Sequence, residues 1–104
     1  MLRIYDKILF VLRALRPVIA TLEQHDRDLA RQLRRCAPSI ALNSAEASGC
    51  RAGTRRQRHH DALGSARETR ACLDAAIALG YIDSLDAALL DALDHICATL
   101  YRLT

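Results

Sequence analysis

Apolar residues recur every three or four positions through four segments of the chain, a spacing that places them on one face of a helix. The four stripes cover residues 4–22, 29–47, 63–80 and 85–103. The last of them, from Leu85 to Leu103, is close to a heptad repeat. No alternating pattern typical of a β-strand competes with these stripes. The pattern therefore predicts an all-α protein with four amphipathic helices.

Local start and stop signals bound these helices. Side chains that can cap a helix N-terminus stand before the last three segments, namely Asp26, Thr54, and Asp83 or Ser84. Gly49 and Gly80 are suited to ending the second and third helices, with Gly80 in the left-handed conformation. Pro17 and Pro38 fall inside the first and second helices, where we expect kinks.

The connections left between the helices are short, near residues 23–26, 49–53 and 80–84. Short connections between long helices favour antiparallel neighbours. With 104 residues the chain fits one domain. We therefore expect an antiparallel up-down-up-down four-helix bundle over residues 1–104. The helices carry more apolar surface than one internal seam needs, so we also expect self-association.

The composition agrees with a helical protein, because 51% of residues are hydrophobic but only 4% are aromatic. The longest strongly apolar run, residues 8–12, is far shorter than the roughly 20 residues of a membrane span. No secretory signal is recognisable at the N-terminus. These features predict a cytoplasmic protein without a membrane partner.

Charge is distributed unevenly along the chain. Residues 27–70 hold ten arginines against four acidic residues, a net charge of +6, within a total of only +3. The densest group is Arg51, Arg55, Arg56 and Arg58, at the connection between the second and third helices. Cations in the first turn of a helix oppose the helix dipole, so local stability does not account for them.

Arginine suits phosphate because its planar fork donates two hydrogen bonds at once. The four central arginines are therefore predicted phosphate contacts, with Arg31, Arg34 and Arg35 as candidates for the same nucleic-acid-binding surface. No aromatic residues interleave with them, so we expect contact with nucleic-acid backbone and shape and not base stacking. The alternative is a solvated basic face that balances the acidic fourth helix.

Polar residues also fall beside the apolar stripes. On the second and third helices they are Ser39, Asn43, Glu46, Ser65 and Glu68. A satisfied polar network can fix which helices face each other, and we expect one here that involves Arg67 or Arg70. The alternative is a carboxylate site in which Glu46 and Glu68 hold a metal or act as acid and base. The Glu-x-x-His motifs of di-metal bundles are missing, so no metal, cofactor or enzyme activity is predicted.

The four cysteines, Cys36, Cys50, Cys72 and Cys97, form no CxxC pair. We interpret them as free thiols, three of which fill space in apolar stretches of a reducing compartment. A zinc site that joins Cys50 to the His59-His60 pair is not expected, because structural zinc takes closely paired ligands.

Three blocks of sequence carry a family likeness. Residues 34–49 read RRCAPSIALNSAEASG, residues 62–68 read ALGSARE, and residues 79–82 read LGYI. In order and spacing they resemble the signature of the four-helix-bundle proteins encoded within 23S ribosomal-RNA intervening sequences. That resemblance implies a homopentamer. It also implies kinship with accessory proteins of diversity-generating retroelements, which associate with a reverse transcriptase and bind nucleic acid.

Taken together, the sequence predicts a non-enzymatic, oligomeric nucleic-acid-binding protein that contacts RNA or DNA backbone through the second-to-third-helix hairpin. The alternative is a scaffold that docks an acidic protein partner.

Overall fold

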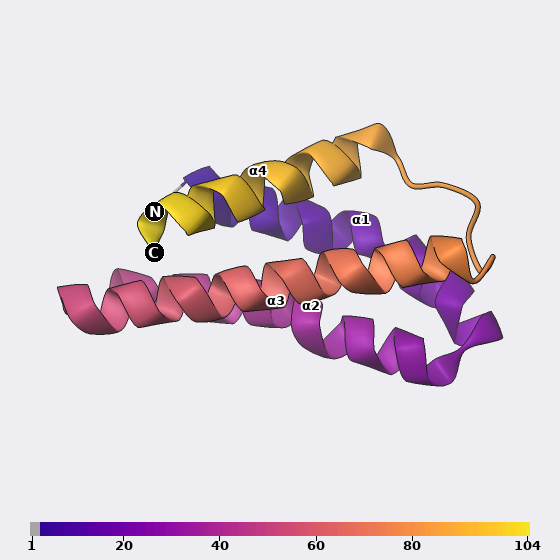
Figure 1. The fold of residues 1–104 in the computed structure, drawn as a ribbon, viewed down its shortest axis with the longest axis horizontal. Helices are drawn as coiled ribbons and strands as arrows, with labels where there is room; N and C mark the ends of the chain where they lie inside the picture. The colour runs from indigo at the N-terminus through magenta and orange to yellow at the C-terminus, as the bar shows by residue number, and fades with distance from the viewer. Residues whose placement is uncertain (1–2) are drawn as a thin grey trace.

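A computed structural model describes residues 3–104, so the first two residues of the expected 1–104 domain lie outside the described residues. Within that range the chain forms four helices and no strand: α1 (Arg3–His25), α2 (Arg27–Ser48), α3 (Ala52–Ala78) and α4 (Ala87–Leu103) (Figure 1). The predicted all-α fold with four helices is confirmed. Both prolines lie inside continuous helices, Pro17 in α1 and Pro38 in α2.

Each helix packs against two others. α2 lies between α1 and α3, and α4 lies between α3 and α1. The molecule is elongated, with extents of 42 × 24 × 19 Å. Its longest helix is α3, with 27 residues, and the connected end of α2 and α3 projects beyond the ends of α1 and α4 (Figure 1). The fold therefore has a body made by four helices and a tip made by two.

The apolar stripes meet in one core to which every helix contributes. Its fully buried large side chains are Ile8, Val11, Leu15 and Leu22 from α1, Leu33 and Ile40 from α2, Leu73 from α3, and Leu89, Leu93, Ile96 and Leu100 from α4. Burial of this apolar surface is the main force that holds the helices together. One expected member of the first stripe, Val18, is only half-buried.

Three of the expected helix ends are confirmed. Asp26 caps α2, because the backbone N–H of Leu29 donates to Asp26 Oδ1 at 3.0 Å. Gly80 follows α3 with φ at +78°, a left-handed conformation that L side chains rarely adopt. Gly49 occupies the C-terminal cap position of α2, where its N–H donates to backbone carbonyls of that helix.

Two expected caps are wrong. Arg51 and not Thr54 holds the N-cap position of α3, and it makes no side-chain capping bond. Asp86 caps α4 by accepting from the N–H of Ala88 at 3.3 Å, so Asp83 and Ser84 lie in the connection. The late start of α4 has a tertiary cause, because Tyr81, Ile82 and Leu85 pack against the core before this helix begins.

Candidate nucleic-acid interface

The α2–α3 tip, residues 47–58, carries the densest group of arginines. Arg51, Arg55 and Arg56 are exposed, and Arg58 is half-buried. The side chains of Arg51 and Arg56 make no hydrogen bond or ion pair with any other residue between 3 and 104. Their charge is therefore uncompensated at the projecting end of the fold.

Arg55 has a structural role that sequence reasoning missed. Its Nε donates to the carbonyl oxygen of Ala47 at 3.3 Å, and its Nη2 donates to that of Cys50 at 2.9 Å. The last carbonyls of a helix lack partners within the helix, and a cation near them also complements the helix dipole. Arg55 thus closes the end of α2 from the first turn of α3.

Arg58 completes a polar network across α2 and α3. Its Nε lies 3.1 Å from Glu46 Oε2, and its Nη1 donates to Asn43 Oδ1 at 3.4 Å. Asn43 in turn donates from Nδ2 to the carbonyl oxygen and the hydroxyl of Ser39, at 3.0 and 3.1 Å. The expected grouping of Ser39, Asn43 and Glu46 is therefore present, but Arg58 joins it instead of Arg67 or Arg70.

Ser65 and Glu68 belong to a different part of the α2–α3 seam. Glu68 accepts a hydrogen bond from Gln32 of α2, and the carbonyl oxygen of Ser65 accepts one from Thr69 at 2.8 Å. These residues line a cleft of about 220 Å³ together with Arg35, Cys36 and Ser39. Glu46 and Glu68 are both exposed and have different partners, so the structure does not bring them together as a carboxylate pair.

Arg31 and Arg34 lie towards α1, whereas Arg35 lines the cleft between α2 and α3. Arg34 pairs with Glu23 of α1, and this hydrogen bond lowers the pKa of the Glu23 carboxyl. Arg31 lies 3.6 Å from Asp28 in an exposed pair. At a rise of about 1.5 Å per residue, Arg34 stands roughly 20 Å from the end of α2. The seven arginines thus divide between the tip and the middle of α2, and the side chains without a partner among residues 3–104 are Arg51 and Arg56 at the tip and Arg35 on α2.

The adjacent histidines of α3 divide between the interior and the surface. His59 is 5% exposed, whereas His60 is exposed. Burial lowers the pKa of His59, and the nearby charge of Arg55 lowers it further. Beside this region on α2, Ser44 is buried and its hydroxyl has no hydrogen-bond partner among the described residues.

The four cysteines are free thiols. Cys36 and Cys72 are buried on facing helices, while Cys50 and Cys97 are half-buried. Burial, and to a smaller extent the neighbouring Cys36, raises the pKa of Cys72 to about 12. No three His, Cys, Asp or Glu side chains gather as a metal-binding cluster anywhere in residues 3–104.

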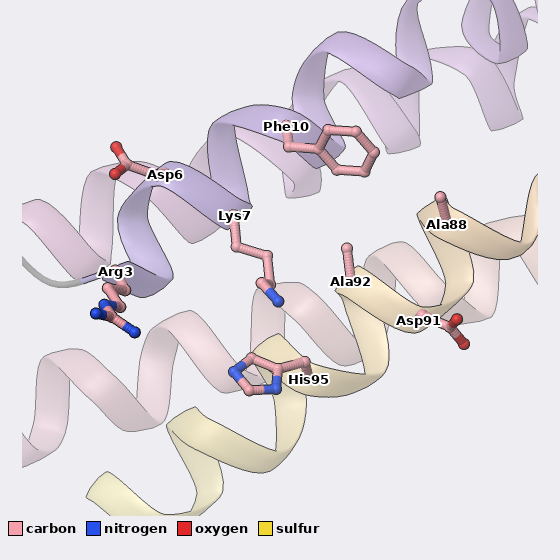
Figure 2. Close-up of a pocket in the computed structure, with 8 residues that line it drawn as sticks. All are labelled: Arg3, Asp6, Lys7, Phe10, Ala88, Asp91, Ala92 and His95. Carbon is pink, nitrogen blue, oxygen red and sulfur yellow. The ribbon is translucent and has the colours of Figure 1, made fainter.

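A groove of about 670 Å³ lies between α1 and α4. Figure 2 shows Lys7 and Phe10 reaching from α1 towards α4, where Ala88, Ala92 and His95 face them, while Asp6 points away. The groove is thus apolar in its middle with cationic groups at one end. None of the four described helices combines the length and the apolar character needed to cross a bilayer.

Comparison with curated proteins and with solved structures finds no match. The family model described as 23S rRNA-intervening sequence protein matches residues 2–102. That match spans nearly the entire chain, including the tip arginines and the polar network that Arg58 completes. The chain therefore belongs to the family of 23S rRNA-intervening sequence proteins.

Proposed function

We propose that this protein is a non-enzymatic, oligomeric nucleic-acid-binding protein that contacts the phosphate backbone of RNA or DNA with its α2–α3 tip. The observation that carries the proposal is the uncompensated charge of Arg51 and Arg56 on the projecting end of the fold. Most protein–nucleic-acid hydrogen bonds go to phosphate and sugar, and arginine is well shaped for them. Membership of a family named for ribosomal RNA fits this role.

The paired arginines would contribute differently. Arg58 is partly neutralised by Glu46, and Arg34 by Glu23. Arg55 donates its hydrogen bonds to backbone carbonyls at the end of α2. We therefore expect Arg51 and Arg56 to carry the phosphate contacts, with Arg35 as a third unpaired cation midway along α2.

We also propose that the subunit is an antiparallel up-down-up-down bundle that assembles as a homopentamer in the cytoplasm. In support, the chain direction given by the colours of Figure 1 reverses between α3 and α4. Residues that pair across α2 and α3, such as Asn43 with Arg58 and Gln32 with Glu68, rise along one helix as they fall along the other. Exposed apolar side chains such as Leu42 and Leu79 favour contact between copies.

The test compares two double variants with the same change in charge. Arg51→Ala/Arg56→Ala alters the tip, and Arg13→Ala/Arg16→Ala alters exposed positions of α1. Affinity for a duplex would be measured by fluorescence anisotropy over a salt series. Each lost phosphate contact should reduce the slope of log affinity against log salt by about 0.9. We expect the tip variant to bind more weakly with a shallower slope, and an equal effect of both variants would refute a tip-specific contact.

A second function, a scaffold for a protein partner such as a reverse transcriptase, is supported by the groove between α1 and α4. Phe10 is 38% exposed there beside Lys7, a combination suited to an apolar side chain flanked by acidic groups. Capture of a partner by tagged protein, with and without nuclease, separates the two functions. A partner that survives nuclease but is lost in Phe10→Ala favours the scaffold.

A further inference from the structure

The C-terminal end of α4 meets the first turns of α3 next to the tip. Thr104 lines a hollow of about 280 Å³ together with Gly53, Arg56, Gln57 and His60. Figure 1 likewise places the end of the chain over the N-terminal half of α3. Drug-sized ligand pockets begin at about 300 Å³, so this hollow has room for one small planar group and not for a large cofactor. Arg56, one of the two unpaired tip cations, thus has a neighbouring surface that the sequence did not reveal.

Tyr101 lies on this same side of α4. Asp94, seven residues earlier, pairs with Arg70 of α3, and residues seven apart share a helix face. Thr104, which lines the hollow, donates from its hydroxyl to the carbonyl oxygen of Tyr101 at 2.7 Å. The spacing from Asp94 places Tyr101 on the side of α4 that faces α3, and Thr104, at the hollow, follows one turn further along the chain.

The ring of Tyr101 is available. The residue is 65% exposed, and its phenol makes no hydrogen bond to any other part of the described chain. The other tyrosines are occupied: Tyr5 and Tyr81 pack against the core, and Tyr81 also stacks on His25. Tyr101 is thus an aromatic side chain that the fold of this subunit does not use.

Basic side chains line the same seam. Arg56 and His60 line the hollow, and Arg67 lies close enough to Cys97 to oppose the rise in its pKa that burial and Asp94 cause. The acidic side chains nearby are engaged, because Asp94 and Asp74 both pair with Arg70. Asp61 likewise accepts from Gln57 at 3.0 Å. The seam therefore presents cations beside an exposed aromatic ring.

Two glycines on α3 leave its surface without side chains near the hollow. Gly64, one turn after His60, has no heavy atom within 4 Å of the position where a Cβ would stand, and the same is true of Gly53. Gly53 itself lines the hollow, where a side chain would take up part of the space. The two glycines therefore leave open space along the seam.

We propose that this seam binds an unpaired nucleotide, whose base stacks on Tyr101 while Arg56 and His60 donate to its phosphates. The inference rests on the proposed function and extends it from duplex backbone to single-stranded nucleic acid. Aromatic stacking on a base tolerates any sequence, since every base has a π-face. A peptide partner would need an anion beside its aromatic group to match these cations, whereas every nucleotide carries both.

The experiment measures binding of a single-stranded RNA and a blunt duplex of equal length by fluorescence anisotropy at one salt concentration. Tyr101→Ala should weaken single-strand binding by roughly 5- to 100-fold, the range for losing one stacked base. It should leave duplex binding unchanged. Tyr101→Phe should retain single-strand binding because it keeps the ring. Phe10→Ala is the matched control, because it removes an exposed aromatic residue from the groove between α1 and α4.

A second measurement reports directly on stacking of a base against Tyr101. A single-stranded RNA that carries 2-aminopurine should lose fluorescence on binding the wild-type protein and Tyr101→Phe, but not Tyr101→Ala. Duplex binding with no Tyr101 effect on the single strand would overturn this inference alone, whereas absence of binding to both RNAs would overturn the proposed function as well. A change in assembly mass of Tyr101→Ala, measured by light scattering, would assign the ring to a subunit interface and overturn the nucleotide site.

Discussion

The hydroxyl of Tyr81 donates a hydrogen bond to Asp26 Oδ2 at 3.2 Å, between residues 55 positions apart in the chain. Asp26 uses its other oxygen to cap α2. One carboxylate therefore joins the turn between α1 and α2 to the connection that follows α3. Stacking of Tyr81 on His25, with ring centroids 5.5 Å apart, reinforces the same junction.

Substitutions at Asp26 should separate its two roles. Asp26→Ala removes the cap and should lower the free energy of unfolding by about 1 kcal/mol or more. Asp26→Asn keeps an oxygen that can cap α2, so it should be milder. Urea unfolding followed by circular dichroism measures both. Tyr81→Phe removes only the bond to Asp26, and a loss as large as that of Asp26→Ala would contradict this division.

Arg55→Ala should behave differently from its neighbours at the tip. Arg55 donates to two backbone carbonyls at the end of α2, and hydrogen bonds from charged groups contribute roughly 1.5–3 kcal/mol when both partners are well shielded. Because this site is largely exposed, we expect a loss of about 1 kcal/mol. Arg51→Ala and Arg56→Ala should leave the unfolding free energy unchanged, and thermal unfolding of the three variants makes the comparison.

Stability should depend on pH through His59. Its pKa in the folded protein is lowered from the ordinary 6.5 by burial and by Arg55, so the folded state binds a proton less readily than the unfolded state. The contribution of neutral His59 is thus fully present above pH 6.5 and is lost as pH falls below that value through the folded pKa.

The melting temperature of the wild type should therefore fall between pH 7 and pH 5 more steeply than that of His59→Leu. His60→Leu is the matched control, because His60 is exposed and adjacent in sequence. Equal slopes for the wild type and His59→Leu would contradict the assignment.

The thiols should differ in reactivity. Cys72 has a pKa of about 12 and is buried against Cys36, so almost none of it is thiolate at pH 8. Cys50 is half-buried at the tip. Iodoacetamide at pH 8, followed by mass spectrometry of peptides, should label Cys50 first and Cys36 and Cys72 last. Labelling in urea, where all four thiols are accessible, sets the reference rates, and rapid labelling of Cys72 in the folded protein would argue against a closed core.

The sequence predicted those features that local chemistry decides. Asp26 and Gly80 act where their side-chain and backbone properties place them, because a cap and a left-handed turn involve only neighbouring residues. The pattern wrongly placed Leu85 in the fourth helix. Leu85 continues the helical spacing, but it packs on the core from the connection before α4. Periodicity reports that a residue is buried without saying whether its backbone is helical.

The partners of the arginines could not be predicted in the same way. Whether Arg58, Arg67 or Arg70 meets the polar residues of α2 depends on how α2 and α3 slide past each other, and sequence spacing does not fix that register. Arg58 joins Asn43 and Glu46, while Arg70 faces Asp94 of α4. Tyr101 was also missed, because it is distant in sequence and reaches the α3 side of the fold only through the packing of α4.

The projecting tip carries side chains that the hydrophobic core does not use. Between Ala47 and His59 no residue is buried, so side chains there can change without disturbing the core. A library randomised at positions 51, 53, 54 and 56, with Arg55 kept to close α2, should vary nucleic-acid binding with little change in the free energy of unfolding. The same freedom would let relatives diverge in what they recognise while their bundles stay alike.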